Sequence, residues 1–104
     1  MNSTNEMKMV RDYIRKLVKR TKNDPYLDKY DVKSRLSVRI VKWNKREHGV
    51  LICVRDLKHP EVKWNNYYNH WDWIRTCGHF WKWNIWKAVN DIVCNMQRED
   101  RLPF

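Results

Sequence analysis

Apolar side chains recur at steps of three and four near the start of the chain, the spacing that places residues on one face of a helix. The residues of this stripe are Met7, Val10, Ile14, Leu17 and Val18. Ser3 and Glu6 have the spacing of a capping box, which begins a helix, and Pro25 cannot continue one. We therefore predict an amphipathic helix from about Thr4 to Thr21.

The middle of the chain has the pattern of β-strands. In residues 35–43, RLSVRIVKW, apolar and polar positions alternate, and residues 50–54, VLICV, form a continuous apolar run of strand-forming residues. Residues 44–49 between them are turn-like and end in glycine, so the two runs predict a β-hairpin. Residues 62–68 are a weaker candidate for a third strand, because two asparagines interrupt them.

The stretch WDWIRTCGHFWKWNIW, residues 71–86, holds five tryptophans and has two interpretations. The alternation of its aromatic residues would suit a second hairpin that turns at Cys77 and Gly78. A helical stripe, in contrast, continues without a break through Ile74, Cys77, Trp81, Ile85, Val89, Ile92 and Met96. Asp72 would cap the N-terminus of that helix. The longer pattern favours a helix from Asp72 to about Arg98.

Together these elements predict an α+β domain in the order helix, strand, strand, strand, helix. An N-terminal amphipathic helix and a long, aromatic-rich C-terminal helix would pack on one face of a two- to three-stranded antiparallel sheet. We expect one small domain over residues 1–104, frayed at residues 1–3 and 100–104, with a polar connection at residues 23–34 anchored by Tyr26 and Tyr30.

The order of elements resembles that of double-stranded RNA-binding domains. Those domains carry a lysine cluster at the start of their second helix, where this chain has Asp72-Trp73-Ile74-Arg75. The resemblance is therefore one of topology alone, and an order of elements does not by itself imply a function.

Positive charge is concentrated in the first half of the chain. The net charge is +10; residues 1–45 contain 13 Lys or Arg against 5 Asp or Glu, whereas residues 46–104 contain 9 against 7. A basic half of this kind indicates an anionic partner, and its regular helical spacing favours a function over a merely solvated face.

The residue pattern suggests how nucleic acid would be bound. Lys8, Arg11, Arg15 and Lys19 form a cationic stripe about 16 Å long beside the apolar stripe of the first helix, a suitable length for phosphate contacts. In the first hairpin, Trp43 lies close to Arg39, Lys42, Lys45 and Arg46. Aromatic rings that stack on bases, beside cations that hold phosphates, are typical of nucleic-acid binding. We predict a small basic binding protein whose partner is nucleic acid, RNA more than DNA.

The surplus of large rings supports an alternative function. A helix that faces one sheet cannot bury rings on all its sides, so at least one or two of the tryptophans should be partly exposed. Trp73, Phe80, Trp83 and Trp86 would then contact a protein with an acidic face, as in a virus- or phage-encoded inhibitor of a host factor. The same rings could close a homodimer.

The sequence offers little for catalysis. His70, Cys77, His79 and Cys94 lack the close spacing of zinc ligands, and Asp56 with Glu61-Val62-Lys63 matches the acidic motif of metal-dependent nucleases only loosely. We expect no enzyme, cofactor or metal. With no long apolar run and no visible secretory signal, and with three widely spaced cysteines, we expect a cytoplasmic or nuclear protein that does not bind membranes.

Overall fold

The computed structural model describes residues 3–69, 71–72 and 79–101, without the side chains of residues 3–6 and 99–101. Its main elements are α1 (Ser3–Lys22), β1 (Leu36–Asn44), β2 (Gly49–Asp56), β3 (Lys63–Tyr68) and α4 (His79–Arg101). The predicted α+β class and the order helix, strand, strand, strand, helix are therefore confirmed.

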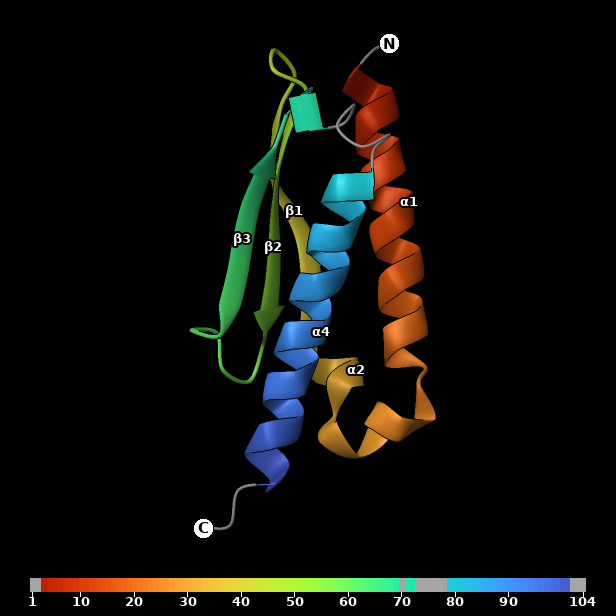
Figure 1. The fold of residues 1–104 in the computed structure, drawn as a ribbon, viewed down its shortest axis with the longest axis vertical. Coiled ribbons are helices and arrows are strands. Elements are labelled where there is room, and N and C mark those ends of the chain that lie inside the picture. Colours follow the sequence, from red (N-terminus) through yellow and green to blue (C-terminus); the bar gives the residue numbers. More distant parts are fainter. Residues whose placement is uncertain (1–2, 70, 73–78, 102–104) are drawn as a thin grey trace.

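The three strands form one antiparallel sheet in the order β1-β2-β3, and both long helices lie on the same side of it (Figure 1). Helix α1 lies beside β1, and α4 crosses β2 and β3. The face toward the helices is apolar: Val38 pairs with Val54, and Ile40 pairs with Ile52. The core therefore fills the space between the sheet and the two helices.

A β-bulge in β1 changes the direction of the side chains near the end of the strand. The pairing shifts between Ile40 and Lys42, so that Lys42 pairs with Leu51 and Trp43 pairs with Val50. Paired residues of an antiparallel ladder point to the same face. Trp43 therefore points toward the helices, as the buried Val50 does, and Lys42 points to the other side of the sheet.

The apolar stripes of both helices meet in this core, as their spacing predicts. Val10, Leu17, Trp81 and Ile85 are each at most 2% exposed. The Tyr13 ring packs edge-on against Trp81 at 5.3 Å, and its hydroxyl donates to the carbonyl of Lys82 at 2.9 Å. These contacts join α1 to α4.

The connection between α1 and β1 differs from the prediction. Residues 23–34, which the sequence predicts to be a polar connection anchored by two tyrosines, contain a 3-10 helix, η1 (Pro25–Tyr30), and most of the short helix α2 (Val32–Arg35). Tyr30 is buried and anchors this segment, whereas Tyr26 is 84% exposed and does not. Asp24 begins η1 because its carboxylate accepts a hydrogen bond from the backbone N–H of Tyr26.

The helical interpretation of the tryptophan-rich stretch is confirmed from His79 onward, and the hairpin alternative is wrong for residues 79–83. Trp71 and Asp72 are also helical, and residues 73–78 lie outside the described part of the chain. Of the predicted stripe, Trp81, Ile85, Val89, Ile92 and Met96 are buried. Ile74 and Cys77 fall among the residues that are not described.

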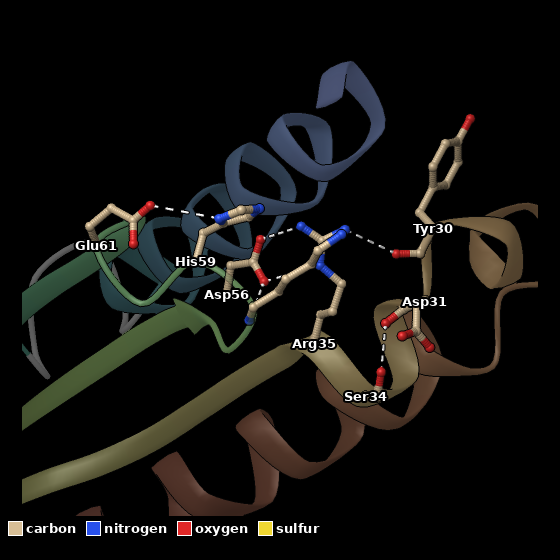
Figure 2. Close-up of polar contacts among 8 residues, drawn as sticks. Tyr30, Asp31, Ser34, Arg35, Asp56, His59 and Glu61 are labelled. Carbon is tan, nitrogen blue, oxygen red and sulfur yellow. Dashed lines mark hydrogen bonds and ion pairs between the residues drawn. The ribbon is translucent and has the colours of Figure 1, made fainter. Parts of the chain in front are cut away.

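A buried ion pair joins the end of α2, directly before β1, to the end of β2 (Figure 2). Arg35 donates to both carboxylate oxygens of Asp56, at 3.1 and 2.6 Å, and also to the backbone carbonyl of Tyr30 at 3.4 Å. The side chains of Arg35 and Asp56 are only 5% and 0% exposed. This forked contact fixes the corner at which the chain passes from α2 into the sheet.

Candidate nucleic-acid interface

A groove lies between the N-terminal part of α1 and the end of β1. Its volume is about 460 Å³, and it is lined by Met7, Lys8, Arg11, Asp12, Arg15, Trp43 and Lys45. The residues of α1 are spaced so that they share one face of the helix, and Trp43 and Lys45 stand at the junction of β1 and its turn. The structure thus brings together five of the nine residues that the sequence predicts to bind nucleic acid.

A second hollow of about 330 Å³ continues the groove along the strand, and four of its six lining residues are apolar. It shares Met7, Arg11 and Arg15 with the first, and it adds Ile14, Val38 and Ile40. Val38 and Ile40 are only partly buried, because α1 does not close completely over β1. The groove therefore combines a cationic rim with an apolar floor.

The groove is electrostatically positive. Four cations line it against one acid, Asp12, whose carboxylate lies 4.0 Å from a guanidinium nitrogen of Arg15. This pair lies on the surface, with side chains 48% and 75% exposed, so it holds Arg15 only weakly. In the described part of the chain, Lys8, Arg11 and Lys45 have no ion pair. No acid among the described residues therefore competes with an anionic ligand for these three cations.

The other four predicted residues lie outside the groove. Arg39 and Lys42 pair with Cys53 and Leu51 and point to the side of the sheet away from the helices. Lys19 lies one turn beyond Arg15 on α1, and Arg46 lies in the turn after β1; both are exposed. The predicted set is therefore divided between the two sides of the sheet.

Sequence reasoning missed the floor of the groove. Ile14 was assigned to the core and Val38 and Ile40 to the sheet, but where one element covers another incompletely is a tertiary property. Asp12 also lines the groove, because helical spacing puts it on the same face as Lys8 and Arg15.

The residues of the alternative, protein-binding surface are also divided. Trp83 and Trp86 are 56% and 44% exposed on α4, as the count of rings led us to expect. Phe80 is half-buried and packs against the core, so it contributes less to an outer surface. Trp73 lies outside the described residues.

The acids that loosely matched a nuclease motif have structural partners. Burial alone would raise the pKa of Asp56, but hydrogen bonds from Arg35 and the Lys58 N–H, with the Arg35 charge, outweigh burial and lower it. Glu61 lies 3.7 Å from His59 (Figure 2). Both carboxylate oxygens of Asp56 therefore accept a hydrogen bond from Arg35.

Among the described residues, no three potential metal ligands lie close enough together to form a metal site. His70 and Cys77 of the weak zinc candidate lie outside the described residues.

Within the described residues, no helix has both the length and the apolar character needed to span a bilayer. Comparison with protein-family models, with curated proteins and with solved structures gave no match to this chain.

Proposed function

We propose that this protein binds nucleic acid, RNA in preference to DNA, through the groove between α1 and β1. The observation that carries the proposal is the convergence of Lys8, Arg11, Arg15 and Lys45 around the half-buried ring of Trp43. Cations at the rim would contact phosphates, and Trp43 with the apolar floor would receive a base that is not held in a duplex. RNA is favoured because its loops and bulges present such bases.

In this proposal the groove cations contact phosphates and the Trp43 ring stacks on a base. Contacts from Lys and Arg to phosphates are insensitive to sequence and weaken as salt rises, whereas a stacked base contributes an affinity that depends little on salt. Trp43 is held by its packing against the core, so its ring would be ordered before a ligand binds.

The test is fluorescence anisotropy with labelled single-stranded RNA and DNA of the same 12-nucleotide sequence. Replacing Arg11 and Arg15 by Glu should reduce affinity roughly 100-fold, because two attractive phosphate contacts become repulsive. The control reverses two exposed cations elsewhere, Lys33 and Arg98, and so gives the same net charge. If both variants bind RNA with the same affinity, the groove is not the binding site.

A second candidate function is supported by Trp83 and Trp86, two exposed rings three residues apart on α4. Residues at this spacing are neighbours on a helix, and exposed tryptophans are frequent anchors of protein interfaces. Replacing both by Ala should abolish capture of a protein partner and leave RNA affinity unchanged. If RNA affinity falls instead, these rings belong to the nucleic-acid interface.

A further inference from the structure

The sheet has a second face, on which the structure describes no helix (Figure 1). The pairing register arranges its side chains in three cross-strand rows. These rows are Ser37, Arg55 and Lys63; Arg39, Cys53 and Asn65; and Lys42, Leu51 and Tyr67. Four of these nine residues are cations and none is an acid. Below, this set of nine residues is called the open face.

The arrangement of cations on the open face lowers the stability of the folded protein. Arg55 lies directly opposite Lys63, and like charges in this position repel each other. In the described part of the chain, Arg39, Lys42, Arg55 and Lys63 have no ion pair with any acid. The guanidinium of Arg55 instead lies over its own strand, 3.9 Å from the Cys53 sulfur. A polyanion would relieve this repulsion.

The open face carries one aromatic ring, that of Tyr67, which lies in the row of Lys42 and has a defined position. The Tyr67 hydroxyl donates to a carboxylate oxygen of Glu47 at 2.6 Å, and this bond is the main cause of the raised pKa of Tyr67. Gly49 is required beneath the side chain, because a Cβ there would overlap with the hydroxyl and the ring of Tyr67. The ring thus extends across β2 while remaining 37% exposed.

We propose that the open face is a second binding site, for a single-stranded segment of nucleic acid, in which Tyr67 stacks on a base and Arg39, Lys42, Arg55 and Lys63 contact phosphates. The chemistry is that of sheet surfaces that bind unpaired strands: a fixed ring supplies a stacking platform, and the surrounding cations follow the backbone. The four cations have no ion pair with any acid in the described part of the chain, and they match a polyanion in charge. The nearby Glu47 carboxylate accepts the Tyr67 hydroxyl and so holds the ring, which selects a polyanion that carries bases.

The site goes beyond the proposed groove and shares with it only the chemical class of ligand. The two are on opposite sides of β1, which is an edge strand of the sheet. A strand that occupies the open face therefore need not enter the groove, and separate variants can test each site.

The experiment measures binding of a fluorescein-labelled 12-nucleotide oligouridylate and of heparin, a polyanion without bases. Tyr67→Ala should weaken oligouridylate binding roughly tenfold through the loss of one stacked base, and it should leave heparin affinity unchanged. Tyr67→Phe keeps the ring and should retain most of the affinity. Gly49→Ala keeps Tyr67 but displaces its ring, so it should reproduce the loss. Circular dichroism and thermal unfolding verify the fold of each variant.

The charges are tested by a matched pair of double variants. Arg39→Gln with Lys63→Gln removes two cations from the open face, and Arg98→Gln with Lys33→Gln removes two exposed cations of the same types elsewhere. Only the double variant of Arg39 and Lys63 should weaken the binding of both oligouridylate and heparin. Equal effects from the two pairs would overturn the phosphate contacts, and wild-type affinity in Tyr67→Ala, or an equal loss of heparin binding, would overturn the stacking role.

The groove variant separates this inference from the proposed function. If the charge reversal of Arg11 and Arg15 abolishes RNA binding while all open-face variants bind normally, the groove is supported as the binding site and the proposed site on the open face is refuted. If only the open-face variants lose affinity for oligouridylate, the open face is supported as a binding site and the proposed binding site in the groove is refuted.

Discussion

The ion pair between Arg35 and Asp56 should dominate the stability of the sheet corner, and Asp56→Asn tests it. The substitution keeps the shape of the side chain but removes one charge, leaving Arg35 charged at 5% exposure. Breaking a buried pair in this way costs about 3–5 kcal/mol, a large part of the roughly 5–15 kcal/mol that stabilise a domain of this size. We expect the urea midpoint to fall by about 2–3 M at a slope of about 1.5 kcal/mol per M.

The control is Asp91→Asn on α4. Asp91 pairs with Lys87 at 2.9 Å, a distance similar to that of the buried pair, but the side chains are 65% and 51% exposed. Exposed pairs four residues apart on a helix contribute only about 0.3–0.5 kcal/mol. Both variants are unfolded in urea and followed by tryptophan fluorescence. Equal losses would refute the reasoning, because burial would then have no part in the effect.

The contribution of Asp56 to folding stability should depend on pH in one direction. Since the pKa of Asp56 is lowered in the folded protein, its contribution to stability is fully present above the ordinary carboxyl pKa and is lost as pH falls through the lowered value. The stability difference between the wild type and Asp56→Asn should therefore be constant near neutral pH and shrink in acid. A difference that grows as pH falls would contradict this assignment.

Three further predictions concern the groove, the core and the cysteines. Four groove cations in contact with a single strand give a log–log salt slope of about −2.8, so RNA affinity should fall roughly 50-fold between 50 and 200 mM salt, and Arg11→Gln should make the slope shallower by about 0.7. Trp81→Ala should destabilise the domain by about 3–5 kcal/mol in urea unfolding, because Trp81 is fully buried; a loss below about 1 kcal/mol would contradict this. In a Cys77→Ser background, a thiol reagent should modify the exposed Cys94 at once and the buried Cys53 only on unfolding, and equal rates would contradict their burial.

The sequence alone determined the two long helices, the first hairpin and half of the groove. Helical and strand periodicities are local properties, so the stripe of α1, the hairpin and the core-facing positions of α4 could be read directly. Lys8, Arg11 and Arg15 share one face of a helix wherever that helix packs. Their meeting with Trp43 and Lys45 depends on how α1 lies along β1, which no local pattern specifies.

Only the tertiary structure decided which side of the sheet each hairpin residue faces. Strict alternation from Ile40 would point Lys42 toward the helices and Trp43 away from them. The bulge between Ile40 and Lys42 reverses both, so that Trp43 enters the groove and Lys42 joins the open face. The burial of Arg35 with Asp56 is likewise a long-range contact, across 21 residues. Because one inserted residue shifts a two-residue period, the face of every later side chain depends on pairing between strands, which the residues of one strand do not encode.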